Sequence, residues 1–169
     1  MFNHQRSKRN RADPIDNSNM DLMELYKRAI NRPTHIPPSF IILGAQKAGT
    51  TALFQMLSNH PDLLPPHKKE LDHFNVDEDY AKGMDHYLSN FPVRSLWRKR
   101  STFEASPAYL YNAGKVAPRL RSQLPDVTCI IILRDPVSRA FSAWTMCRDF
   151  KSGSKPQPWH EHRTFRQAV

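Results

Sequence analysis

Two short apolar runs, each followed by a polar loop and a helical pattern, constrain the fold of this chain more than any other feature. Residues 40–43 read Phe-Ile-Ile-Leu, and residues 127–133 read Val-Thr-Cys-Ile-Ile-Ile-Leu. The first run is unbroken and β-rich, which is typical of a strand buried on both faces of a parallel sheet, and the second is the strongest strand in the chain. Strands that alternate with helices form βαβ units with right-handed crossovers. The sequence therefore predicts an α/β fold in which helices flank a parallel β-sheet.

The remaining elements follow from apolar spacing and from the proline-rich stretches between them. Helices are predicted over 20–30, 50–57, 80–91, 115–124 and 137–148, a short strand over 102–105 and a loop over 60–66. We expect a disordered basic tail over 1–18, a helix and linker over 19–36, and one domain over 37–169.

The formal net charge of +9 indicates an anionic partner, although the sign alone does not identify it. The cationic residues show no array interleaved with aromatic residues, so a nucleic-acid partner is not expected. No apolar run approaches the roughly 18 residues that span a bilayer. The N-terminus lacks the apolar core of a secretory signal. The chain as written is therefore expected to be soluble, and cytoplasmic by default.

Two cysteines, Cys129 and Cys147, are too few for a disulfide framework and show no metal-ligand spacing. We expect both to be reduced and buried as small apolar side chains. No metal site is predicted.

The loop Gly-Ala-Gln-Lys-Ala-Gly-Thr-Thr, residues 44–51, joins the first strand to the next helix. Unpaired N–H groups and the helix dipole at such a junction bind phosphate or sulfate oxygens. Gly44 and Gly49 let the backbone approach the anion. Lys47 adds a positive charge, and the threonines add hydroxyl donors. The loop therefore predicts an anion site, with a plain helix cap as the alternative.

This loop departs from the nucleoside-triphosphate P-loop, in which a lysine directly follows the second glycine. Here Thr50 occupies that position, and the lysine has moved inside the loop to Lys47. The departure argues against an ATPase, a GTPase or a P-loop kinase.

A second candidate anion site follows the second apolar strand. Arg134 stands at the carboxyl end of this strand, where open α/β sheets place ligand contacts, and a guanidinium binds phosphate in a bidentate manner. Ser142 lies about two turns into the next helix and could donate to the same anion. Asp135, before Pro136, is interpreted as a device that starts this helix. Two such sites suit a nucleotide that is charged at both ends of its ribose.

With these two motifs, the chain resembles the sulfotransferases that use 3′-phosphoadenylyl sulfate (PAPS), especially the glycan branch that includes heparan sulfate sulfotransferases. The resemblance covers residues 38–150 and depends on Ile-Leu-Gly-Ala-Gln-Lys-Ala-Gly-Thr-Thr-Ala-Leu and Leu-Arg-Asp-Pro-Val-Ser-Arg-Ala-Phe-Ser. Segments 69–74, 103–109 and 116–119 follow the family pattern in the same order. The resemblance implies the P-loop NTPase-like sulfotransferase fold.

The resemblance also assigns roles. The 5′-phosphosulfate of PAPS would contact Gln46, Lys47, Ala48, Gly49, Thr50 and Thr51, and the 3′-phosphate would contact Arg134 and Ser142. Lys47 would stabilise charge on the bridging oxygen. Glu70 would act as general base toward a hydroxyl or amine acceptor, with a carbohydrate as the expected class. A surface carboxylate is the alternative for Glu70, and His67 and His73 are alternative bases.

Two departures from the family leave alternatives open. Ala105 stands where the heparan sulfate branch usually has a lysine, and the chain stops at Val169, before further acceptor elements and a basic loop of the family. We therefore expect an incomplete domain, with a non-catalytic nucleotide- or glycan-binding fragment as the alternative. The Golgi lumen is the alternative location that the resemblance implies.

Overall fold

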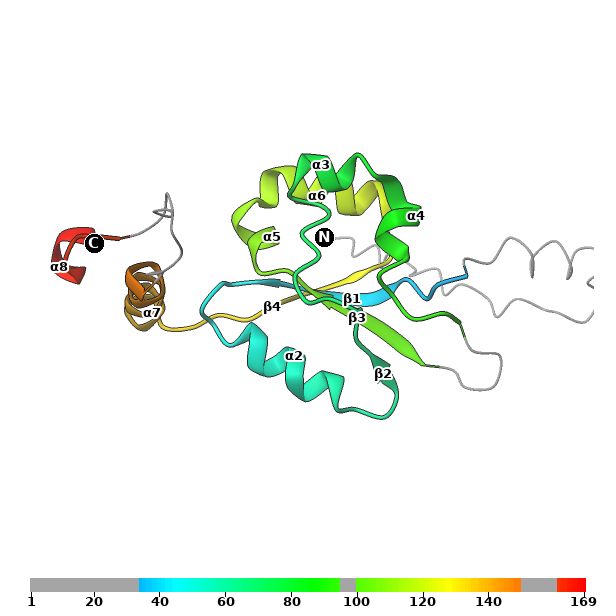
Figure 1. Ribbon diagram of the computed structural model, residues 1–169, viewed down its shortest axis with the longest axis horizontal. Coiled ribbons are helices and arrows are strands. Elements are labelled where there is room, and N and C mark those ends of the chain that lie inside the picture. The colour runs from blue at the N-terminus through cyan, green and yellow to red at the C-terminus, as the bar shows by residue number, and fades with distance from the viewer. Residues whose placement is uncertain (1–33, 95–99, 150–160) are drawn as a thin grey trace, which may run out of the picture. The chain divides into compact units, whose positions relative to one another are not determined.

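The computed structural model describes residues 34–94, 100–149 and 161–169 (Figure 1). The tail expected over 1–18 and the helix expected over 20–30 lie outside these residues. The strands are β1 (Pro38–Gly44), β2 (Leu63–Leu64), β3 (Ser101–Ala105) and β4 (Thr128–Ile131). The helices are α2 (Thr50–Ser58), α3 (Asp77–Tyr80), α4 (Gly83–Leu88), α5 (Ala108–Tyr111), α6 (Ala113–Gln123), α7 (Pro136–Asp149) and α8 (Phe165–Ala168).

The four strands form one parallel sheet in the order β2-β3-β1-β4. Strand β1 is central, and Ile41 pairs with Glu104 of β3 on one side and with Cys129 of β4 on the other. Helix α2 lies on one face of the sheet, and α3 to α6 lie on the other (Figure 1). The predicted α/β class with a parallel sheet flanked by helices is confirmed.

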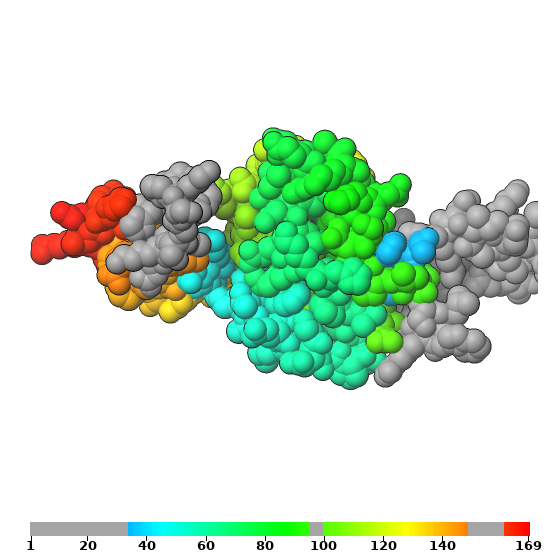
Figure 2. All heavy atoms as spheres, viewed as in Figure 1, coloured from blue at the N-terminus to red at the C-terminus, as the bar shows by residue number. Residues whose placement is uncertain are grey.

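Successive residues of β1 face opposite sides of the sheet, so the strand contributes to two cores. Ile41 belongs to a core with α4 to α6 that includes Phe74, Tyr87 and Tyr109. Ile42 belongs to the core on the other face, where Phe103 and the apolar side of α2 pack. In Figure 2 the cyan to green side chains of residues 50–90 close over the strands on the side that is seen. This double burial explains why the β1 run contains no polar alternation.

Strand β4 has a different environment, because it forms an edge of the sheet within the described residues. Cys129 is exposed and Ile131 is 49% exposed. The expectation that Cys129 is buried was therefore wrong: an apolar run identifies a strand but not whether both of its faces are covered. Cys147, on α7, is half-buried.

Local features also differ from the predictions. The helix predicted over 80–91 is shorter: it is α4, which begins at Gly83 with φ +79°, and Tyr80 is the last residue of the separate helix α3. The predicted loop over 60–66 contains β2, which is held by pairing with β3. Helix α5 was not predicted. No helix of the described ranges is long and apolar enough to cross a membrane.

Gly44 allows the end of β1 to pass close to α5. It has φ +143°, and a Cβ at this position would lie 2.9 Å from the carbonyl oxygen of Pro107 and 3.0 Å from Cβ of Leu110. A backbone atom and a helix Cβ cannot move aside as a flexible side-chain end can. Gly44 is therefore required for packing of the loop that follows β1.

The variant Gly44→Ala is expected to lower the free energy of unfolding by about 2 kcal/mol, through steric overlap and backbone strain. Gly114→Ala is the matched control, because a Cβ there meets no atom within 4 Å. At this position inside α6 the control should raise stability by about 0.5–1 kcal/mol. Urea unfolding of both variants measures the difference, and equal effects would contradict the packing role of Gly44.

Candidate functional site

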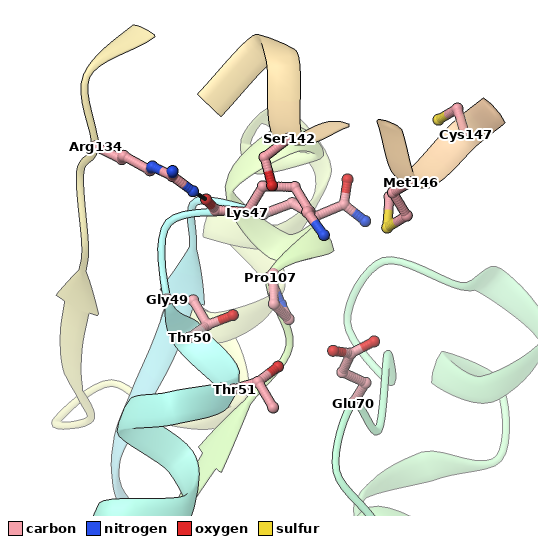
Figure 3. A pocket seen from close by; sticks show the side chains of 11 residues that line it. Lys47, Gly49, Thr50, Thr51, Glu70, Pro107, Arg134, Ser142, Met146 and Cys147 are labelled. Atoms are coloured by element: carbon pink, nitrogen blue, oxygen red, sulfur yellow. Dashed lines mark hydrogen bonds between the residues drawn. The ribbon is translucent and has the colours of Figure 1, made fainter. Parts of the chain in front are cut away.

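A cavity of about 710 Å³ lies at the carboxyl ends of β1, β3 and β4. Its lining residues are Gln46, Lys47, Gly49, Thr50, Thr51, Glu70, Pro107, Arg134, Ser142, Met146 and Cys147. They come from the loop after β1, the segment before α3, the end of β3, the end of β4 and helix α7 (Figure 3). Parallel strands place such segments together because all their carboxyl ends meet at one edge.

The loop between β1 and α2 presents its backbone toward this cavity. Lys47 and Gly49 have positive φ values of 66° and 101°, and the Ala48 N–H donates to the carbonyl of Ala45 at 3.1 Å. The Leu53 N–H then donates to the carbonyl of Gly49 at 3.0 Å and closes the first helical turn. The amides before Leu53 stand at the helix N-terminus, where N–H groups have no intrahelical acceptor. Such a turn attracts an anion.

The ends of β1 and β4 are in direct contact. The Arg134 guanidinium donates to the carbonyl oxygen of Lys47 at 3.1 Å, so the two cationic residues share one edge of the cavity. The Asp135 carboxylate accepts the Ser138 N–H at 2.8 Å, which confirms its interpretation as the residue that starts α7. This hydrogen bond keeps the pKa of Asp135 below its usual value. Helix α7 then carries Ser142 to the cavity.

Glu70 reaches the same cavity from the opposite side, and its carboxylate is exposed (Figure 3). It forms an ion pair with Lys69. Its backbone lies in the left-handed region, with φ +59°, and its N–H donates to the carbonyl of Ala105 at 3.2 Å. Ala105, where the resemblance to the heparan sulfate branch leads us to expect a lysine, is fully buried and packs in the core with Phe103.

Eight of the nine residues that the sequence nominated line this cavity. They are Gln46, Lys47, Gly49, Thr50, Thr51, Glu70, Arg134 and Ser142. Ala48 belongs to the loop but does not line the cavity. Pro107, Met146 and Cys147 line it and were not nominated, because nothing in their residue types indicates an anion site. Within the described residues, no group of three His, Cys, Asp or Glu side chains could hold a metal ion.

The alternative bases do not line this cavity. His67 is exposed elsewhere, and His73 is only 3% exposed, with its ring stacked on Tyr87 at a centroid distance of 4.8 Å. His73 lines a separate cavity of about 180 Å³ with Asp79 and His86, among others. Burial lowers the pKa of His73. Among the three candidates, the structure brings Glu70 alone to the cavity.

Comparison with known proteins assigns the family. Residues 37–168 match the sulfotransferase domain. The chain belongs to the sulfotransferase domain family.

The family's curated members include relatives of several kinds. The chain is 36% identical to the membrane-associated sulfotransferase kil1 of Dictyostelium discoideum, covering 72% of this chain and 25% of that protein. It is 35% identical to heparan sulfate glucosamine 3-O-sulfotransferase 5 of Mus musculus, covering 68% of this chain and 32% of that protein. The chain therefore spans about a quarter to a third of the length of these relatives.

A solved structure agrees with the fold. The crystal structure of a sulfotransferase from Alicyclobacillus acidocaldarius matches with a TM-score of 0.61 and 34% identity. The match covers 78% of this chain and 55% of that one.

The burial of His73 predicts a pH dependence of stability. Its pKa is lowered in the folded chain. Below about pH 6.5, the unfolded chain therefore binds a proton at this histidine that the folded chain does not bind. The free energy of unfolding should therefore fall as the pH falls from 7 to 5, by at most about 1.4 kcal/mol per pH unit from this group. His73→Gln should flatten this dependence. Exposed His67→Gln is the control, and equal slopes for both variants in urea unfolding would reject the prediction.

Proposed function

We propose that this chain carries the nucleotide-binding part of a sulfotransferase that moves a sulfuryl group from PAPS to a carbohydrate hydroxyl or amine. The observation that supports the proposal most is the shared cavity of Lys47, Arg134, Ser142 and Glu70. Two cations, a helix N-terminus and a carboxylate face one space there. These groups match a nucleotide with two separate anionic groups and an acceptor that must lose a proton.

The donor would be held from two sides. The loop 46–51 would bind the 5′-phosphosulfate through backbone amides and the Thr50 and Thr51 hydroxyls. Arg134 and Ser142 would bind the 3′-phosphate. In this arrangement the nucleotide meets cationic groups that stand at the ends of β1 and β4. Fixed charges stabilise a transition state without reorganisation at the moment of reaction.

The transfer is a substitution at sulfur. The acceptor oxygen or nitrogen forms a bond to sulfur, and the bond between sulfur and the bridging oxygen of the phosphosulfate breaks. The Glu70 carboxylate takes the acceptor proton. Lys47 stabilises the negative charge that develops on the leaving phosphate oxygen. The products are a sulfated acceptor and 3′,5′-adenosine bisphosphate.

The acceptor class comes from the relatives. Two groups of them are named for sulfation of heparan sulfate: the 3-O-sulfotransferases and the bifunctional N-deacetylase/N-sulfotransferases, one of which, from Homo sapiens, is 37% identical. The net charge of +9 would favour an acidic glycan of this kind. A second candidate is nucleotide binding without transfer, which is favoured by Ala105, an uncharged and buried residue where the heparan sulfate branch is expected to have a lysine.

Substitution of the two strand-end cations tests the site. Lys47→Ala should lower sulfate transfer from PAPS to heparan-type acceptors about 100-fold or more, since it removes a charge at the reacting bond. Arg134→Ala should weaken binding of 3′,5′-adenosine bisphosphate about 10- to 100-fold. Calorimetry measures the binding, and labelled sulfate measures the transfer.

Lys115→Ala is the matched control, because this lysine of α6 pairs with Asp77, and neither residue lines the cavity. Wild-type binding and transfer in both site variants would discard the assignment. Tighter binding of ATP with magnesium than of the bisphosphate would favour a P-loop kinase or NTPase. Bisphosphate binding without transfer to any acceptor would leave the binding function alone.

A further inference from the structure

Glu104 of β3 is a fully buried carboxylate at the centre of a hydroxyl network. It is 0% exposed, and three O–H groups donate to it: those of Tyr87 at 2.5 Å, Ser106 at 2.7 Å and Tyr109 at 2.7 Å. It forms no ion pair with any residue that the structure describes. Burial raises its pKa. A buried carboxyl is costly even when it is hydrogen-bonded, so an apolar residue would stabilise this core more simply.

Two of the three hydroxyls also bind the segment that carries Glu70. We call residues 70–74 the Glu70 loop. The Ser106 hydroxyl oxygen accepts the Asp72 N–H at 3.2 Å, and the Tyr109 hydroxyl oxygen accepts the Phe74 N–H at 3.4 Å. At two points, a single hydroxyl group therefore connects the Glu104 carboxylate to the backbone of this loop.

The Glu70 loop requires such support because its backbone is unfavourable. Glu70 and Asp72 have φ values of 59° and 54°, in the left-handed region that residues with a Cβ rarely adopt. Conformations of this kind persist only where surrounding contacts fix them. The contacts here are the Glu70 N–H bond to Ala105 and the two hydroxyl bonds that depend on Glu104.

The carboxylate also orients the two hydroxyls. A hydroxyl has one hydrogen and two lone pairs, so donation to Glu104 leaves the oxygen of Ser106 or Tyr109 free to accept an amide. An apolar residue at position 104 would not impose this direction. Each loop N–H therefore donates to a hydroxyl oxygen whose own hydrogen is donated to Glu104, and that donation polarises the oxygen.

We propose that Glu104 is a positioning residue, which holds the Glu70 loop through Ser106 and Tyr109 and so fixes the Glu70 carboxylate at the cavity. The effect on catalysis rests on the proposed role of Glu70 as base. The effect on the loop itself does not.

The chain offers a matched set of variants, each of which removes one oxygen from the network. Ser106→Ala and Tyr109→Phe remove a hydroxyl that joins Glu104 to the loop. Tyr87→Phe removes a hydroxyl that donates only to the other carboxylate oxygen. All three delete one hydrogen bond to Glu104, but Ser106→Ala and Tyr109→Phe also delete the acceptor of a loop amide. Glu104→Leu therefore tests the carboxylate itself, because it keeps both hydroxyls.

Hydrogen exchange at the Asp72 and Phe74 amides, measured by NMR at native pH, tests the loop directly. We expect roughly three- to tenfold faster exchange in Glu104→Leu than in Tyr87→Phe, as for the loss of one buried hydrogen bond. Ser106→Ala and Tyr109→Phe are the references in which a loop amide loses its acceptor directly. Binding of 3′,5′-adenosine bisphosphate should not change. Transfer by Glu104→Leu should show a lower kcat with an unchanged KM for PAPS.

The outcomes separate the two proposals. Equal exchange in Glu104→Leu and Tyr87→Phe overturns the positioning role, whatever the transfer rate. Faster loop exchange with an undiminished kcat removes the link between the loop and catalysis. If the wild-type chain transfers no sulfate while the exchange pattern holds, the proposed function fails and the positioning of the loop stands.

Discussion

Parallel pairing of β1 with β3 on one side and β4 on the other is the constraint on which the rest of the structure depends. It continues beyond the strands, because the Ile132 N–H donates to the carbonyl of Gly44 at 2.7 Å and the Ala45 N–H donates to the carbonyl of Ile132 at 2.9 Å. These bonds bring Lys47 and Arg134 to the same edge. Segments that are 87 positions apart in the chain thus meet in one hydrogen bond.

The cavity combines groups of opposite character that are held by different parts of the fold. The cationic side is built on strand ends and a helix N-terminus. The carboxylate side is a loop whose backbone is unfavourable and whose support comes from β3 and α5. Under the proposed function, the two sides have separate tasks: the cationic side would bind the nucleotide, and the carboxylate side would activate the acceptor.

Much of this architecture could be predicted from sequence, since β1 is buried on both faces and its apolar run reports that burial. The glycine-bounded loop and Arg134 could be identified because strand ends place ligand contacts at known positions. Other features depend on tertiary context. Strand β2 exists only through its pairing with β3, and Cys129 is exposed because β4 is an edge within the described residues.

The network around Glu104 also could not be predicted from the sequence. Glutamate in a β-rich segment is usually a solvated residue, and its burial depends on hydroxyls from α4, from the residue after β3 and from α5. The lining residues Met146 and Cys147 were missed for a similar reason, since an amphipathic helix pattern does not state which neighbour the helix faces.

The central claim is that the residues at the ends of β1 and β4 bind one adenosine nucleotide together. Chemical-shift mapping with 3′,5′-adenosine bisphosphate tests it most directly. The account predicts that the amides of residues 46–51 and those of Arg134 and Ser142 shift together, with one shared dissociation constant. Shifts confined to one strand end, or two ends that titrate with different constants, would contradict it.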